Sequence, residues 1–157
     1  MPTDDPLEHA ELTFLLGMAF QLVLGEFVDR LDARGYTDLR PMHGLVFQVL
    51  RGTGATGTEL ADRLGVTKQA AGQIIGDLEQ RGYLRRQAHP GGGRRRLVVL
   101  TDKALRHLAV AGGVLHQLES ELADQVDDSA LTALRAELAR LIRLLAGDDI
   151  PPLRPLW

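Results

Sequence analysis

The sequence predicts a mainly α fold with one small β-ribbon, and three observations lead to this prediction. Apolar residues recur at helical spacing over most of the 157 residues. The middle of the chain carries two short helical patterns joined by a tight turn. Directly after them, two short extended runs flank a tip rich in glycine and arginine. The length, with 45% hydrophobic and 25% charged residues, is that of a single globular domain, residues 1–157.

A long apolar helix is expected over residues 8–33, after a short polar tail. It is apolar around most of its circumference from Leu12 to Val28. Its apolar stretch of about 17 residues, which contains Gln21 and Glu26, falls short of the roughly 20 that a bilayer requires, so we expect no membrane span. A soluble helix that is apolar all round must be buried all round. Its second face is therefore expected to pack on another copy of the chain.

The next helix is expected to begin near Pro41, whose missing N–H costs nothing in the first helical turn. The segment Gly52-Thr53-Gly54 ends it. Its buried face is expected to consist of four aliphatic residues: Leu45, Val46, Val49 and Leu50.

The two short helical patterns of the middle stretch are bounded by capping residues. Thr56 and Glu59 have the spacing of a capping box, in which each side chain accepts from a backbone N–H of the other residue. Gly65 can supply the left-handed residue that stops this helix, and Val66 can fill the turn. Thr67 is a good N-cap for the second helix. These signals predict a helix-turn-helix.

The second of these helices has two distinct faces. One is apolar and consists of Ala70, Ala71, Ile74, Ile75 and Leu78. The other carries a lysine, amides and glycines: Lys68, Gln69, Gly72, Gln73 and Gly76. Each glycine costs roughly 1 kcal/mol of helix stability relative to alanine. Close approach to another surface, such as a DNA groove, can offset that cost.

Gly82 ends this helix, and the extended runs that follow are Tyr83–Ala88 and Arg96–Leu100. Between them the tip reads HPGGGRRR, in which proline and glycine make a turn. Three consecutive arginines repel one another unless a polyanion neutralises them. A helix-turn-helix followed by a basic β-wing is typical of DNA-binding proteins.

The stretch TGTELADRLGVTKQAAGQIIGDLEQRGYLRR, with a wing that closes in RRRLVVLT, resembles the winged helix-turn-helix of the MarR family of bacterial transcriptional regulators. The flanking helices resemble the family as well. The resemblance implies a homodimeric repressor that binds a pseudo-palindromic operator in double-stranded DNA and is relieved by a small aromatic effector. It implies a winged helix-turn-helix over residues 38–101 and dimerisation helices over residues 8–33 and 102–146. One departure is Gly92, which stands where the family's wing usually has an acidic residue.

The predicted DNA contacts come from the second helix and the wing. The N-terminal part of a recognition helix meets the bases, and glutamine side chains suit adenine edges. Arg94 is expected in the minor groove, and Arg95 and Arg96 at phosphates or beside the wing. The residues expected in the major groove are Thr67, Lys68, Gln69, Gly72 and Gln73.

An effector pocket between the dimerisation helices and the DNA-binding region is implied by the resemblance alone. For each residue taken singly, ordinary packing is the competing interpretation, because a methionine or phenylalanine at helical spacing is usually part of a core. The residues implied are Phe14, Met18, Met42, His43, Phe47, His107 and Ala111.

Charge is distributed unevenly along the chain, whose net charge is −3. Residues 62–106 carry 10 Lys and Arg against 4 Asp and Glu, whereas the segments on either side are acidic. The positive charge thus coincides with the predicted DNA-binding motif. There is no cysteine, and the acidic N-terminus is unlike a signal peptide, so we expect a cytoplasmic protein.

Other classes of function find little support in the sequence. The five histidines lack chelating spacing, so neither a metal site nor a cofactor is expected. No catalytic motif is present, and the run of three glycines does not lie between a strand and a helix. We therefore do not expect this protein to be an enzyme. A winged-helix module that binds proteins or ligands without specific DNA binding remains the alternative, supported by Gly92 and the acidic flanks.

Two further helices are expected after the wing. Thr101 caps the first of them, from Asp102 to about Gln125, and the pair Gly112-Gly113 in its middle indicates a kink or a close contact. Ser129 is expected to cap the last helix. Residues 148–157 form a Pro-rich tail, which is either disordered or docked through Trp157.

Overall fold

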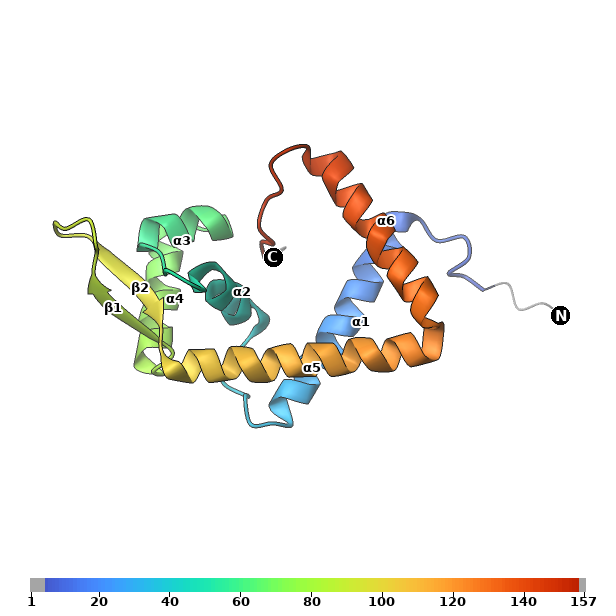
Figure 1. Ribbon diagram of the computed structural model, residues 1–157, viewed down its shortest axis with the longest axis horizontal. Coiled ribbons are helices and arrows are strands. Elements are labelled where there is room, and N and C mark those ends of the chain that lie inside the picture. Colours follow the sequence, from blue (N-terminus) through green and yellow to red (C-terminus); the bar gives the residue numbers. More distant parts are fainter. Residues whose placement is uncertain (1–4, 156–157) are drawn as a thin grey trace. The chain divides into compact units, whose positions relative to one another are not determined.

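The computed structural model describes residues 5–155 and divides the chain into two compact units, one up to Asp38 and one from Leu39 onward. Trp157 lies outside the described residues. The described part is mainly helical with one two-stranded antiparallel sheet, so the predicted fold class is confirmed (Figure 1). The elements in chain order are α1 (Leu12–Asp32), α2 (Pro41–Leu50), α3 (Gly57–Leu64), α4 (Lys68–Gln80), β1 (Leu84–Ala88), β2 (Arg96–Leu100), α5 (Asp102–Val126) and α6 (Asp128–Ala146).

Helix α1 begins four residues later than the sequence indicated. Residues 6–10 form turns, in which the Glu8 N–H donates to Asp5 O at 3.0 Å and the Ala10 N–H donates to Leu7 O at 3.3 Å. Glu11, the N-cap, is extended with φ −62° and ψ 144°, and this conformation separates the turns from the helix. The expected start near residue 8 was therefore wrong.

Helix α1 is also long and apolar enough to cross a membrane by length and composition. Its 21 residues include an 18-residue window with a mean hydropathy of 1.5. The expectation that the stretch is too short for a bilayer was therefore wrong. Core helices of soluble proteins have the same length and composition. Much of the apolar surface of α1 is exposed, and Leu22, at 75%, is its most exposed large apolar side chain.

The core of the second unit joins α2, α3 and α4 to the sheet and the start of α5. Helix α2 contributes Val46, Phe47 and Leu50, while Leu45 and Val49 are only partly buried. The buried face of α2 is therefore rotated from the predicted one. The aromatic ring of Phe47 accounts for this difference, because it packs 5.6 Å from the ring of Tyr83 and 5.7 Å from that of His107.

The sheet is a two-stranded ribbon whose register pairs Leu84 with Leu100 and Ala88 with Arg96. It is tied to the α2–α3 connection by an isolated bridge, in which Ala55 and Val98 exchange backbone hydrogen bonds of 3.1 and 2.8 Å. Gly54, with φ +77°, permits this approach, because a Cβ there would lie 2.4 Å from Val98 O. The expected strands are confirmed to within one residue.

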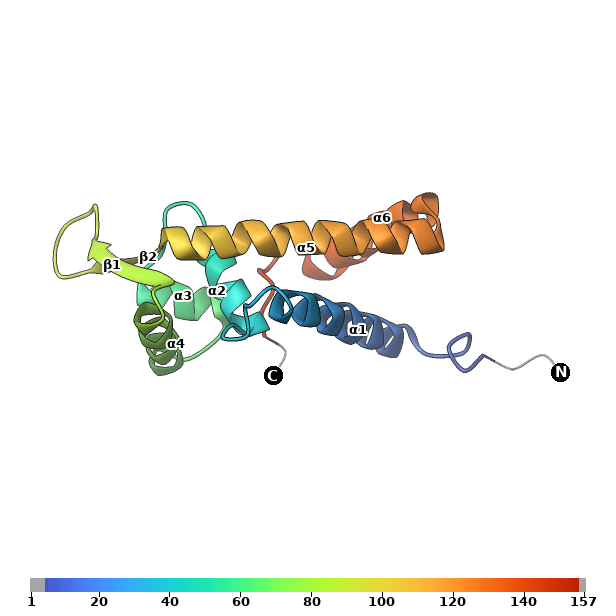
Figure 2. The same cartoon turned by 90° about the horizontal axis from the view of Figure 1, so that it is seen from below.

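Helix α5 runs unbroken through Gly112 and Gly113, so these glycines mark no break in the helix. A Cβ at either position would meet nothing within 4 Å. Helix α6 turns back from the far end of α5 (Figures 1 and 2). Its N-cap is Asp127, with φ +94°, and Ser129 lies inside the helix with its hydroxyl donating to the Asp127 carboxylate. The prediction that Ser129 caps this helix was therefore wrong.

The C-terminal segment, residues 148–155, returns from α6 to the helix-turn-helix (Figure 1). Its Arg154 guanidinium donates to Asp62 O and to Arg63 O, both at 3.4 Å. Both carbonyls belong to the last turn of α3. Through these contacts the described part of the segment lies against the helix-turn-helix within the second unit.

Candidate nucleic-acid interface

Helix α3 starts with a complete capping box. The Glu59 N–H donates to Thr56 Oγ1 at 3.3 Å, and the Thr56 N–H donates to Glu59 Oε2 at 2.7 Å. The hydrogen bond from the Thr56 backbone, with a second from its hydroxyl, lowers the pKa of Glu59 below its usual value. The buried face of the helix consists of Leu60, Ala61 and Leu64. The sequence predicted both the cap and this face.

The turn that follows sets the start of α4. Gly65 is left-handed, with φ 69° and ψ 30°, and the Val66 N–H donates to Ala61 O at 3.0 Å. The partly buried Val66 side chain packs on the core. Thr67 then caps α4, since its Oγ1 accepts from the Ala70 N–H at 3.1 Å. The turn and both capping residues are confirmed.

Helix α4 buries its apolar face and leaves its polar face in solvent. Ala71, Ile75 and Leu78 are buried. All five residues predicted for the major groove are exposed and lie on the first two turns and the N-cap: Thr67, Lys68, Gln69, Gly72 and Gln73. A Cβ built on Gly72 or Gly76 would meet nothing within 4 Å. Packing within the chain therefore does not require glycine at either position.

The C-terminal end of α4 is held by the residues that begin α5. The Lys103 Nζ donates to Arg81 O, the C-cap carbonyl of α4, at 2.7 Å and lies 4.2 Å from the centre of the Tyr83 ring. The Thr101 hydroxyl lies 2.7 Å from Gly82 O and 3.0 Å from Tyr83 O. This joint fixes the orientation of α4 relative to α5. The sequence pattern did not predict this role of Lys103, although the residues after the wing carry the necessary hydroxyl and ammonium groups.

The wing consists of β1, β2 and the loop between them, and its tip is built from glycine. The His89 Nδ1 accepts from the Gly91 N–H at 2.9 Å, and His89 O accepts from the Gly92 N–H at 2.9 Å. Gly92 and Gly93 have φ of +74° and +78°, a region that L side chains rarely adopt. Glycine at position 92 thus suits the backbone of this tip.

The three wing arginines, Arg94, Arg95 and Arg96, are all exposed. They lie at the end of the unit that also carries α4 and that is opposite to the α5–α6 turn (Figures 1 and 2). Strand β1 adds two further guanidinium groups that sequence analysis missed. Arg86 forms an ion pair with Glu79 of α4 at 3.1 Å, and Arg85 donates to Gln87 Oε1 at 2.9 Å. The Arg-Arg pair shortly before the basic tip is the feature of the sequence that could have predicted these two groups.

The residues predicted for an effector pocket are divided between the two units. Phe14 and Met18 lie exposed on α1, in the first unit. His43, Phe47, His107 and Ala111 are buried in the second unit, and Met42 is partly buried. The His43 Nδ1 accepts from the Arg40 N–H at 3.0 Å at the start of α2. In this structure His43 therefore takes part in the cap of α2, and the rings of Phe47 and His107 pack against each other.

Part of this arrangement is similar to a known protein family. A sequence model of the MarR family matches residues 37–95. This range includes α2, α3, α4, β1 and the wing loop as far as Arg95. This segment, which contains the helix-turn-helix, is therefore similar to the MarR family. An uncharacterized protein of Mycobacterium tuberculosis is 33% identical over 90 residues, which make up 57% of this chain and 63% of that relative. The match thus spans less than two thirds of the relative's length.

Solved MarR-type structures share the fold over most of the chain. The Staphylococcus aureus MepR–DNA complex is 17% identical with a TM-score of 0.65, and the match covers 85% of this chain and 97% of that one. CouR from Rhodococcus jostii RHA1, bound to p-coumaroyl-CoA, is 20% identical with a TM-score of 0.64, and the match covers 88% and 94%. At these identities the likeness shows that the chain shares the fold of these proteins.

Proposed function

We propose that this protein is a sequence-specific DNA-binding transcriptional regulator of the cytoplasm, not an enzyme, and acts as a dimeric repressor. The observation that carries the proposal is the exposed face of α4. Its lysine, two glutamines and glycine stand clear of the core on a helix that is capped and buttressed at both ends. A wing with three exposed arginines lies at the same end of the unit (Figure 1).

The chemistry of these residues suggests how each contributes to DNA recognition. Gln69 and Gln73 are one helical turn apart and suit adenine edges, while Lys68 suits guanine or phosphate. The absent side chain of Gly72 lets the helix backbone approach the groove closely. Arg94 is proposed for the minor groove, and Arg95 and Arg96 for phosphates. MepR, which shares the fold, has been solved in complex with DNA.

Exposed apolar surface supports a homodimer. No residue of α6, all of which the structure describes, is buried, and Leu144 and Leu145 are 80% and 79% exposed. Leu22 of α1 is 75% exposed. Burying such side chains stabilises an interface by about 25 cal/mol per Å² of apolar area. Two copies with recognition helices about 34 Å apart would meet successive major grooves, which requires a pseudo-palindromic operator.

Relief of repression by a small aromatic effector completes the proposal. CouR has been solved with p-coumaroyl-CoA bound. An effector acts by binding more tightly to a dimer whose helix spacing no longer matches the operator, and it shifts the equilibrium only by that difference in affinity. The residues proposed to contact it are Phe14, Met18, Met42, His43, Phe47, His107 and Ala111.

The test is fluorescence anisotropy with duplex DNA from upstream of the protein's own gene, across a salt series and against excess random duplex. A DNA-binding regulator loses affinity steeply with salt, and log K falls linearly with log salt. Binding that resists random competitor supports the proposal. Binding that is weak at every salt concentration and without preference, for this duplex and for genomic fragments selected with the protein, refutes it. That result favours a winged-helix module for protein or ligand binding.

A further inference from the structure

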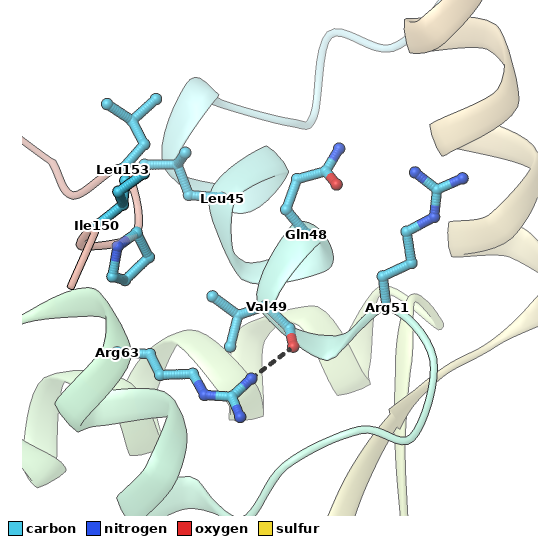
Figure 3. Close-up of a pocket in the computed structure, with 8 residues that line it drawn as sticks. Leu45, Gln48, Val49, Arg51, Arg63, Ile150 and Leu153 are labelled. Carbon is cyan, nitrogen blue, oxygen red and sulfur yellow. Dashed lines mark hydrogen bonds between the residues drawn. The ribbon is translucent and has the colours of Figure 1, made fainter. Parts of the chain in front are cut away.

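A groove of about 570 Å³ opens between the C-terminal segment and the outer face of α2 (Figure 3). Its walls come from segments about a hundred residues apart in the sequence. One wall is Leu45 and Val49, which are only partly buried by the core, and the other is Ile150, Pro152 and Leu153. Among residues 5–155, every apolar residue of the lining is aliphatic, and no aromatic ring takes part. The groove therefore suits a flexible hydrocarbon chain better than a stacked ring.

The remaining lining residues are polar and lie in two places, Gln48 and Arg51 on one side and Arg63 below Val49 on the other (Figure 3). In Figure 3, Leu45, Ile150 and Leu153 lie together on one side, while Gln48 and Arg51 lie on the other. Arg63 borders the groove along α3, and its Nη1 donates to Val49 O at 3.4 Å. This hydrogen bond positions the guanidinium at the edge of the groove and leaves its other N–H donors for a ligand.

We propose that this groove binds a medium-chain aliphatic carboxylate. The aliphatic walls remove the hydrocarbon chain from water, and Arg63 at the edge of the groove binds the carboxylate. A guanidinium suits a carboxylate because its N–H groups can form two parallel hydrogen bonds to the two oxygens. The volume lies in the usual range for small-molecule sites, roughly 300–1,000 Å³. The groove is distinct from the residues proposed above for an aromatic effector.

The wall supplied by the C-terminal segment is anchored on the helix-turn-helix. Arg154 donates to the last carbonyls of α3, and a Cβ on Gly65 would lie 3.1 Å from Arg154 Cδ. A ligand that bridges the two walls thus stabilises the contact between this segment and the turn before α4. Any effect on operator affinity rests on the proposed function, whereas binding of the carboxylate itself does not.

The experiment is calorimetric titration of the full-length protein with octanoate, and with octan-1-ol as the uncharged counterpart. Arg63→Gln is expected to weaken octanoate binding at least about fivefold, because a charged hydrogen bond is lost. Leu153→Asp is expected to abolish it, since it places a carboxylate in the wall. Arg140→Gln on α6 removes the same charge from a side chain that is 81% exposed, and it should bind octanoate like the wild type.

Three results would overturn the proposal: no heat with octanoate, equal affinity for octan-1-ol, or octanoate binding that is unchanged in both groove variants. The last result would place the ligand elsewhere, for example on the apolar faces of α1 and α6. Duplex DNA is titrated separately without octanoate. If Arg63→Gln loses DNA affinity and octanoate does not bind, Arg63 contacts a phosphate and the carboxylate site is refuted, while the proposed regulator stands.

Discussion

Replacing Lys103 with methionine tests whether the start of α5 holds the end of the recognition helix. The variant removes the 2.7 Å hydrogen bond from Nζ to Arg81 O and the ammonium that lies 4.2 Å from the Tyr83 ring centre. Lys103 is exposed, so the lower ends of the usual ranges apply. The hydrogen bond contributes about 0.5 kcal/mol and the cation–π contact about 0.5–1 kcal/mol. Lys103→Met should therefore destabilise the fold by about 1–1.5 kcal/mol.

Urea unfolding at a fixed protein concentration measures this loss, and the melting temperature should fall by about 2–6 °C for a chain of this size. Arg106→Met is the matched control, because it removes one positive charge from an exposed side chain of the same helix. Amide hydrogen exchange should accelerate in the last turn of α4 in Lys103→Met but not in the control. Equal stability and equal exchange in the two variants would show that the joint does not hold the helix.

Four further predictions concern the interface, the cap and the dimer. Arg94→Ala should weaken binding to all duplexes and reduce the slope of log K against log salt by about 1. An unchanged slope would show that Arg94 of the wing does not contact the DNA. Gly72→Ala should stabilise the unbound protein by up to about 1 kcal/mol in urea yet weaken DNA binding in anisotropy, so unchanged affinity would argue against close approach. Because the pKa of Glu59 is lowered from 4.5 in the folded state, its cap stabilises the fold at neutral pH, and this contribution is lost as pH falls through the folded pKa. The gap in urea midpoint between wild type and Glu59→Gln should therefore close on acidification, and a constant gap would contradict this. Leu22→Asp should abolish dimerisation and operator binding together, and a variant that remains dimeric by sedimentation would place the interface elsewhere.

The parts of the fold that the sequence predicted are those decided by local chemistry. Thr56, Gly65 and Thr67 perform the capping roles expected of them, because caps and left-handed glycines act through backbone groups a few residues away. Where several neighbours have the same capacity, local chemistry does not choose between them. Asp127 and Ser129 are both capable N-caps at the start of α6, and Asp127 occupies the N-cap position without a capping hydrogen bond from its side chain.

The sequence pattern could not predict features that depend on contacts between residues far apart in the chain. Helix α2 offers apolar residues around most of its short circumference, so its buried face is chosen by two rings: Tyr83, directly before β1, and His107 of α5. The contacts of Arg154 with the end of α3 join residues more than 90 positions apart. No periodicity in a Pro-rich segment of this length indicates such a partner.

The two glycines on α4 connect the stability of the chain to its proposed partner. In a helix of 13 residues, Gly72 and Gly76 together cost about 2 kcal/mol relative to alanine. A Cβ at either position would meet nothing in this chain, so internal packing does not explain their presence. We propose that the reason is a surface outside the chain that comes within a side chain's length of the helix backbone. The neighbouring Lys68, Gln69 and Gln73 are donors suited to phosphates and base edges, which makes the major groove of DNA the surface that fits both the glycines and their neighbours.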